Sequence, residues 1–490
     1  MKLLKRKETV ALLLSIVTLL LIREFWLLSR NGIHVDESLS FMLSAYKNIG
    51  MYSIPSNPLT GSKLRELMWF SDSSFSGWAS DILNLWKDNR DTPHSNLYYS
   101  LLRTWFIFGG GNNRFFVMFW AGQLNIILSA VSMLCVWRII IGITGSDIIA
   151  TAAMFIAFIS TGSITNTLFL RPYQLQETAF CLYFLMMYFY IVERRNSSSF
   201  MVVFGVITAI TALTGYFSLI LLAMSSIVLL YVYVKRFFEG GDRHIKELIY
   251  YIIITLLVLF LVYPPYLFVF GSRQSEALSK ASNAIENVRD SIHSLKMLNE
   301  YYFLPIYFYS ISVFISIYSL IRNRTKNDFF VLSLLLCVMF WYLIVMFFAP
   351  YKVSRYVLPI TPMLTISYAY FSFKISMKNN IVAFVLCISF VALSLHQYVN
   401  STVQYQYGNL PKECKYYDDS VTFVITQAYR INSIAQCLQD DKIYNFTNNP
   451  EHATRERPQI LFSDVEIKDD LYYMYTKKQS YSYFYEYRLK

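Results

Sequence analysis

The segment that decides the fold is residues 9–38, which read TVALLLSIVTLLLIREFWLLSRNGIHVDES. Its apolar part, residues 9–28, is long enough to cross a bilayer, which requires about 20 apolar residues. Basic residues precede it and no small-residue cleavage site follows it. We therefore expect a retained helix with a cytoplasmic N-terminus rather than a cleaved signal peptide. Two adjacent carboxylates, Asp36 and Glu37, follow this helix on the outer side, and we expect the chemistry there.

The composition of the chain indicates a polytopic membrane protein. Of its 490 residues, 55% are hydrophobic and only 15% are charged, which is too apolar for a soluble domain. The formal net charge is +11, but the basic residues form short clusters between apolar runs instead of one basic stripe. Such clusters orient helices in a membrane, and we expect no nucleic-acid partner.

Ten further apolar segments follow the first one, so the predicted fold is an all-α membrane protein with about 11 transmembrane helices. A single helix cannot accommodate residues 200–234, and Thr214-Gly215-Tyr216 is the natural place for a turn. The predicted spans are 115–137, 148–165, 177–192, 200–214, 216–234, 249–270, 303–320, 329–348, 356–373 and 381–396.

The loops that this count places in the cytoplasm are all basic, as the positive-inside rule requires. They contain Arg138, Arg194, Arg195, Lys235, Arg236, Arg243, Lys246, Arg322, Arg324, Lys326, Lys374 and Lys378. The polar stretches at 31–114, 271–302 and 349–355, together with the tail, then lie outside.

Two domains are expected. Residues 1–396 form a transmembrane catalytic domain, in which the first outer loop, 31–114, carries amphipathic helices in the membrane interface. Those helices are predicted at 64–69 with 82–86, and at 97–108. Residues 397–490 are rich in Tyr, Asn and Asp with few long apolar runs, which indicates a small outward-facing α/β-like domain.

Cysteine placement agrees with this division. The two cysteines of the tail, Cys414 and Cys437, could form a disulfide in an oxidising compartment, or remain two free buried thiols. A disulfide would close a loop of about two dozen residues and stabilise the fold by roughly 3 kcal/mol. Neither has a partner at zinc-binding spacing. The other four lie in predicted spans as small apolar side chains: Cys135, Cys181, Cys337 and Cys387.

Three more polar clusters are expected on the outer face. Residues 91–99 read DTPHSNLYY, residues 170–174 read LRPYQ and residues 352–362 read KVSRYVLPITP. A surface histidine and a snorkelling arginine are the ordinary alternatives for the first two clusters. Basic residues on the side that the positive-inside rule disfavours call for an anionic partner, and a lipid phosphate lies at this depth. The candidate site residues are Asp91, His94, Tyr99, Arg171, Tyr173, Lys352, Arg355 and Tyr356.

The order of these motifs resembles the GT-C type integral membrane glycosyltransferases. The resemblance is to the bacterial relatives of the protein O-mannosyltransferases and of the lipid A aminoarabinose transferase. It covers residues 2–396, and HVDES and SRYVLPITP are its most specific parts. The chain departs from this group at Ser95-Asn96, where two prolines are usual, and in the spacing of Asp91 from residues 97–99.

The resemblance implies inverting transfer of a sugar from a polyprenyl-phosphate donor on the outer face. Asp36 is expected to be the general base, and Glu37 to orient the acceptor or help hold a divalent cation such as Mg²⁺ or Mn²⁺. No glycine-rich nucleotide loop is present, which agrees with a lipid-linked donor. The residues expected to bind the donor phosphate are Arg355, Lys352 and Arg171. Those expected to contact substrate are His94, Asp91, Tyr99, Tyr173 and Tyr356.

The sequence says less about the acceptor than about the donor. Length, topology and the outward tail are similar to the phage-borne serotype-converting glucosyltransferases, which implies transfer of glucose to O-antigen. The chain would then lie in a bacterial inner membrane, with its active site and tail in the periplasm, downstream of a donor synthase and a flippase. Modification of lipid A or of protein uses the same donor type and stays open. A polyprenyl-linked glycan transporter is a further alternative, although no matching halves are found in the sequence.

Overall fold

The computed structural model divides into two compact units. The membrane unit comprises Met1–Trp26, Asp91–Tyr98 and Asn125–Gln404, and the sheet unit comprises Leu27–Arg90, Tyr99–Leu124 and Tyr405–Lys490. The structure describes residues 6–69, 72–88, 91, 94–109, 113–240, 243–264, 288–294, 296, 306–323, 325–349, 353–376, 379–406, 421–455, 458–467, 475–480 and 484–490.

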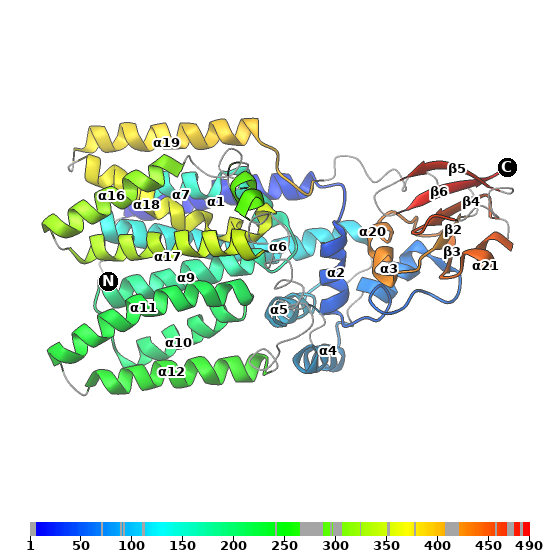
Figure 1. Cartoon of the computed structure of the whole chain (residues 1–490), viewed down its shortest axis with the longest axis horizontal. Coiled ribbons are helices and arrows are strands. Elements are labelled where there is room, and N and C mark those ends of the chain that lie inside the picture. Colours follow the sequence, from blue (N-terminus) through cyan, green and yellow to red (C-terminus); the bar gives the residue numbers. More distant parts are fainter. Residues whose placement is uncertain are drawn as a thin grey trace. The chain divides into compact units, whose positions relative to one another are not determined.

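Long helices lie wholly or largely in the membrane unit, and each predicted span overlaps at least one of them. Figure 1 shows α9, α11 and α17 running alongside one another. In chain order the helices are α1 (Arg6–Leu28), α6 (Arg114–Thr144), α7 (Asp147–Phe158), α8 (Thr161–Leu168), α9 (Tyr173–Ile191), α10 (Ser198–Ala212), α11 (Tyr216–Gly240), α12 (Arg243–Val262), α16 (Ile306–Asn323), α17 (Lys326–Phe348), α18 (Thr361–Ile375) and α19 (Asn380–Asn400).

Among the described residues, five helices are long and apolar enough to cross a membrane by themselves. A sixth span results if α7 and α8, which are bent by 64° at a short break, count as one. The span predicted at 148–165 corresponds to this bent pair and stays a prediction, and the bend itself was not predicted. Ser160 accepts a hydrogen bond from the backbone N–H of Ser163 and starts a new helix in the middle of the apolar run. The chain is a multi-pass helical protein, and the number of 11 spans stays a prediction.

The turn predicted within residues 200–234 is confirmed. Helix α10 ends at Ala212 and α11 begins at Tyr216. Between them Gly215 has a φ of +154°, a backbone conformation that side-chain-bearing residues rarely adopt.

The centre of the membrane unit is built from α9, α17 and α18. Trp341 of α17 is fully buried, and its indole N–H donates to the carbonyl of Phe217 at 2.7 Å. The outer helices expose large apolar side chains such as Leu14 and Leu257. Exposed apolar surface on this scale is typical of helices that face lipid.

The sheet unit combines short helices with a six-stranded sheet of order β1-β3-β2-β4-β6-β5. Strands β3, β2 and β4 are parallel, and the outer pairs are antiparallel. The helices are α2 (Val35–Ser44), α3 (Gly61–Trp69), α4 (Phe75–Lys87), α5 (Leu97–Trp105), α20 (Ile431–Ile434) and α21 (Pro450–Arg455). The strands are β1 (Leu59–Thr60), β2 (Val421–Val424), β3 (Ile443–Thr447), β4 (Ile460–Ser463), β5 (Tyr475–Ser480) and β6 (Tyr485–Leu489).

Two features of this unit are absent from the sequence analysis. The stretch after His34 is a helix, α2, and not an irregular segment. Strand β1 of the first outer loop pairs with β3 of the tail, with Leu59 opposite Tyr444. The first loop and the tail therefore share one sheet, while the expected domain boundary at residues 396 and 397 stays a prediction.

A glycine makes the close approach of α3 to the tail possible. A Cβ on Gly61 would lie 2.3 Å from the carbonyl oxygen of Gln439 and 2.8 Å from the Cβ of Leu438. Its own N–H donates to the same Gln439 carbonyl at 3.1 Å. Any larger residue at position 61 would push α3 away from the tail.

The cysteines agree with the expectations as far as they are described. Cys135, Cys181 and Cys337 are free and buried in the membrane unit. Cys437 is disulfide-bonded. Its expected partner, Cys414, lies outside the described residues, so this pairing stays a prediction.

The pairing predicts a redox-dependent stability. A reductant should lower the melting temperature of the wild type, because opening a loop of this size costs roughly 3 kcal/mol in the chain-entropy model. Cys414→Ser and Cys437→Ser should both melt at the temperature of the reduced wild type and no longer respond to the reductant. Cys135→Ala, which changes a free thiol, should keep the response. Peptide mapping without reduction checks the pairing directly, and a Cys437 peptide joined to a partner other than Cys414 would contradict it.

Candidate functional site

The two carboxylates after the first helix have different environments. Glu37 is fully buried, and its Oε2 accepts from Arg30 Nη2 at 2.6 Å in an equally buried ion pair. The same oxygen accepts from the backbone N–H of His34 at 2.7 Å, which closes the capping box at the start of α2. The Glu37 carboxylate thus serves to pair the charge of Arg30 and to cap the start of α2. These contacts do not suit a metal ligand, and we assign it no such role.

Asp36 remains accessible beside this buried pair. Its carboxylate side chain is 30% exposed and lies in the first turn of α2, where the helix dipole favours negative charge. Its backbone N–H donates to His34 Nδ1 at 3.1 Å, so that ring nitrogen carries no proton in this arrangement. The 3.6 Å approach of the same nitrogen to Asp36 Oδ2 is then not an ion pair. Asp36 is the carboxylate of the two that solvent can reach.

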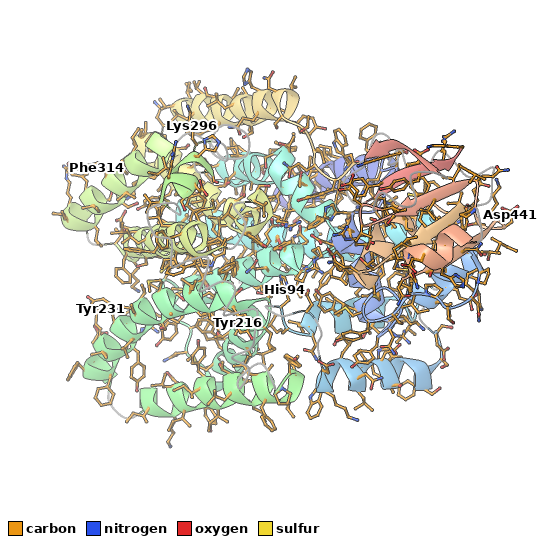
Figure 2. The ribbon with its side chains drawn as sticks, turned by 45° about the vertical axis from the view of Figure 1, so that its right-hand side comes forward. His94, Tyr216, Tyr231, Lys296, Phe314 and Asp441 are labelled. Carbon is orange, nitrogen blue, oxygen red and sulfur yellow. The ribbon has the colours of Figure 1, made fainter. Side chains whose placement is uncertain are left out.

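In the membrane unit, the predicted clusters at residues 91–99 and 170–174 meet at Asp91. Arg171 Nη2 lies 2.9 Å from Asp91 Oδ2, and both side chains are less than one-tenth exposed. His94 Nδ1 lies 3.3 Å from the same oxygen. His94 also lies beside the turn between α10 and α11, next to Gly215 and Tyr216 (Figure 2). The Asp91 carboxylate therefore contacts an arginine that is 80 positions further along the chain.

Aromatic rings link this ion pair to the SRYVLPITP segment. The ring of Tyr173 lies edge-on to His94 at 5.9 Å and to Tyr356 at 6.0 Å. The guanidinium of Arg355 lies over the rings of Phe169 and Tyr356, at 5.6 Å and 5.8 Å. Such cation–π contacts help to fix the position of the guanidinium. All three predicted clusters are thus brought together in the membrane unit.

The loop that carries Arg171 is held by an amide from α6. Asn125 Nδ2 donates to the carbonyls of Thr167 and Phe169 at 3.0 Å and 3.2 Å, and so satisfies acceptors at the C-terminal end of α8. Pro172 then precedes α9 with a φ of −57°, which suits a helix start. The loop is therefore short and fixed at both ends, which restricts the positions that the Arg171 backbone can adopt.

Two prolines shape the segment that carries Arg355. Two short 3₁₀ helices, Ser354–Tyr356 and Leu358–Ile360, precede α18. Pro359 and Pro362 lie in the first positions of the second 3₁₀ helix and of α18, where a missing N–H costs no hydrogen bond. The repeated restarts turn the chain and leave Arg355 half-buried on the aromatic rings.

Two other candidates and one basic residue of residues 31–114 are not part of this group of contacts. Tyr99 is fully buried in the sheet unit, and Lys352 lies outside the described residues. Arg103 of α5 is paired with Asp81 at 2.7 Å and donates to the carbonyl of Asp72 at 2.5 Å. Burial raises the pKa of Asp81, and the Arg103 hydrogen bond and charge offset part of that rise. Arg103 is therefore held within the sheet unit by a carboxylate and a backbone carbonyl.

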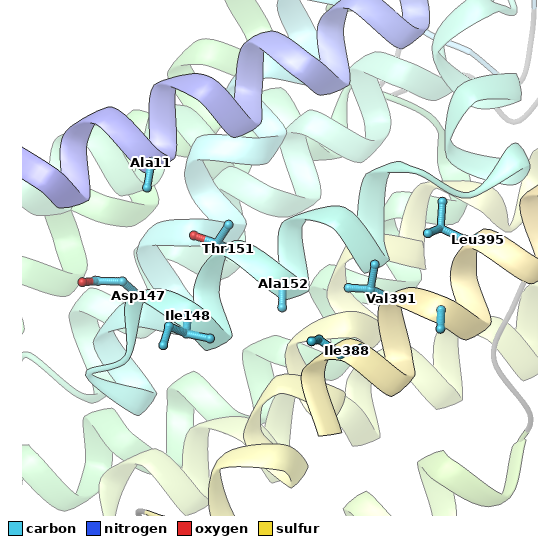
Figure 3. Close-up of a pocket in the computed structure, with 9 residues that line it drawn as sticks. Ala11, Asp147, Ile148, Thr151, Ala152, Ile388, Val391 and Leu395 are labelled. Carbon is cyan, nitrogen blue, oxygen red and sulfur yellow. The ribbon is translucent and has the colours of Figure 1, made fainter. Parts of the chain in front are cut away.

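An apolar cavity of about 460 Å³ lies between α1, α7 and α19 (Figure 3). Ile148, Val391 and Leu395 are among its lining residues, and none of the predicted site residues lines it. Within the described ranges, no group of three or more His, Cys, Asp or Glu side chains is arranged to hold a metal ion.

The fold is similar to that of a solved GT-C type membrane glycosyltransferase. ArnT from Cupriavidus metallidurans bound to undecaprenyl phosphate superposes with a TM-score of 0.53 over 97% of both chains, at 10% identity. The resemblance found in the sequence is thereby confirmed at the level of the fold. At this identity the similarity establishes the fold alone.

Two further solved structures are similar to a lesser degree. ArnT in the apo state gives a TM-score of 0.49 at 11% identity and covers 97% of both chains. The oligosaccharyltransferase of Archaeoglobus fulgidus with Zn and sulfate gives 0.46 at 12% identity, over 93% of this chain and 69% of its own. No protein-family model and no curated protein sequence matches the chain.

Proposed function

We propose that the chain is an inverting glycosyltransferase that uses a polyprenyl-phosphate sugar as donor. The observation that carries this proposal is the convergence of the Asp91, Arg171 and Arg355 segments in a unit of GT-C fold. Cations and aromatic rings gathered at one place suit a lipid phosphate that carries a sugar. ArnT was solved with undecaprenyl phosphate bound, which supports the same class of carrier for this chain.

In the proposed reaction, an acceptor hydroxyl oxygen attacks the anomeric carbon of the sugar. The bond from that carbon to the phosphate oxygen breaks, and polyprenyl phosphate leaves. Asp36 takes the hydroxyl proton as the new bond forms, because an alcohol is a poor nucleophile at neutral pH. Attack opposite to the leaving group inverts the anomeric carbon.

Charge balance explains the need for cations. The donor is a phosphodiester with one negative charge, and the leaving polyprenyl phosphate gains a second one. Fixed positive groups that meet this developing charge lower the barrier, since they do not reorganise during the reaction. We assign this role to Arg355, to Lys352 and to Arg171. Asp91 holds Arg171 and His94, and Tyr173 and Tyr356 supply ring faces for the sugar.

We propose the periplasmic face of a bacterial inner membrane as the location, and O-antigen with glucose as acceptor and sugar. The basic cytoplasmic loops and the outward tail support this orientation. Lipid A and protein remain alternative acceptors, because they would require the same donor chemistry. A polyprenyl-glycan transporter would move the donor without breaking its anomeric bond.

The test is direct transfer by the purified chain in liposomes. Undecaprenyl-phosphate glucose with a radiolabelled sugar is supplied, together with O-antigen, lipid A or membrane protein in separate reactions. Label in one acceptor, with release of undecaprenyl phosphate, supports the proposal and identifies the acceptor class. Donor that crosses the bilayer with its anomeric bond intact would identify a transporter and overturn the proposal.

A further inference from the structure

Residues of the C-terminal tail hold both sides of the segment that carries Asp36. The backbone N–H of Ile33 donates to Gln436 Oε1 at 2.5 Å, and Gln436 Nε2 donates to the Ile33 carbonyl at 2.6 Å. On the other side, Ser38 Oγ donates to Asn432 Oδ1 at 2.9 Å. These contacts join residues about 400 positions apart, and all of them lie within the sheet unit.

The two tail residues are four positions apart. Asn432 lies in α20, and Gln436 follows just after this helix ends at Ile434. Helices α2 and α20 lie side by side (Figure 1). Both amides are almost completely buried. A buried amide that pairs both its donor and its acceptor fixes position more strictly than an apolar contact does, since misalignment leaves polar groups unsatisfied.

The tail segment is itself anchored. Arg65 of α3 donates to the carbonyls of Ala435 and Leu438 at 2.9 Å and 2.8 Å, and also forms an ion pair with Asp440. Cys437, next to Gln436, is disulfide-bonded. Asn432 also donates to the Gly50 carbonyl at 2.9 Å. The tail segment is therefore fixed in place, and the amides of Asn432 and Gln436 hold the start of α2 against it.

We infer that Asn432 and Gln436 are positioning residues for the base Asp36, so that the tail is part of the catalytic apparatus. This inference rests on the proposed function. A 1 Å misplacement of a reacting group can cost about 100-fold in rate. Loss of either amide should therefore reduce turnover although neither residue touches substrate.

The test compares Gln436→Met and Asn432→Leu with Gln439→Met. Methionine and leucine keep the side-chain bulk and remove the hydrogen bonds, and Gln439 is an exposed glutamine three positions further along the chain. Full-length variants in liposomes are assayed for transfer, and hydrogen exchange is measured on the peptide containing residues 33–38. We expect kcat to fall by about 10- to 100-fold with the donor KM unchanged, and exchange in 33–38 to accelerate. The control should behave as wild type.

The possible outcomes distinguish failure of the positioning role from failure of the proposed glycosyltransferase function. Unchanged exchange in residues 33–38, or faster exchange with wild-type kcat, would overturn the positioning role while the glycosyltransferase function stands. A rise in donor KM with unchanged kcat would also overturn it, because that pattern reports donor binding. If the wild type transfers no sugar to any acceptor, the proposed function itself fails and the inference falls with it.

Discussion

Asp36→Asn should reduce sugar transfer by about 100- to 10,000-fold while the protein remains folded. General-base catalysis contributes roughly 100- to 10,000-fold, and an amide of the same shape cannot accept the hydroxyl proton. Because the Asp36 side chain is partly exposed, its replacement should leave the melting temperature within a few degrees of wild type. The measurement is kcat with polyprenyl-phosphate glucose, at matched amounts of folded protein.

Glu37→Gln is the matched comparison, one residue away. It leaves Arg30 as a buried charge without its carboxylate, and breaking a buried pair in this way costs about 3–5 kcal/mol. The expected result is a large loss of stability and of folded protein. The molecules that do fold should still transfer some sugar. If Asp36→Asn transfers sugar at the wild-type rate, Asp36 is not the base. If Glu37→Gln is fully stable but inactive, the roles of the two carboxylates are reversed.

Arg355→Gln should lower kcat by about 100- to 1000-fold, the effect of removing one preorganised group from a developing negative charge. The Arg355 guanidinium lies over the rings of Phe169 and Tyr356, in the segment where we propose that the donor phosphate binds. Arg355→Lys should recover only part of the loss, because an ammonium cannot reproduce two parallel hydrogen bonds. Arg322→Gln, at an exposed arginine of α16, is the control. Wild-type kcat in Arg355→Gln would contradict the assignment.

Arg171 requires a different design because Asp91 depends on it. Arg171→Gln alone leaves a buried carboxylate beside His94 and should destabilise the protein. Combining it with Asp91→Asn removes the unpaired charge and should restore much of the stability. If the double variant folds but stays impaired in transfer, Arg171 contributes charge to the reaction. Full recovery of transfer would limit the pair to a structural role.

The sequence by itself determined the helical framework of this protein. Whether about 20 successive residues are apolar is a local property, and so is the glycine that separates α10 from α11. The polar motifs at Asp36, Asp91, Arg171 and Arg355 were also recognisable, since each lies within a short stretch with unusual charge. The bend between α7 and α8 was missed, because an apolar run has the same composition whether or not a serine cap interrupts it.

Only the tertiary structure decided which of these residues lie close together and which already have a charged or hydrogen-bonding partner within the protein. The His34-x-x-Glu37 spacing carried a signal for a capping box, but His34 is not a usual cap residue, and nothing local identifies Arg30 as the partner of Glu37. The Asp91–Arg171 pair, the β1–β3 pairing and the hold of Gln436 on Ile33 join distant segments. Hydrophobic length is encoded in each segment separately, whereas an ion pair or a buried amide contact exists only once packing brings two segments together.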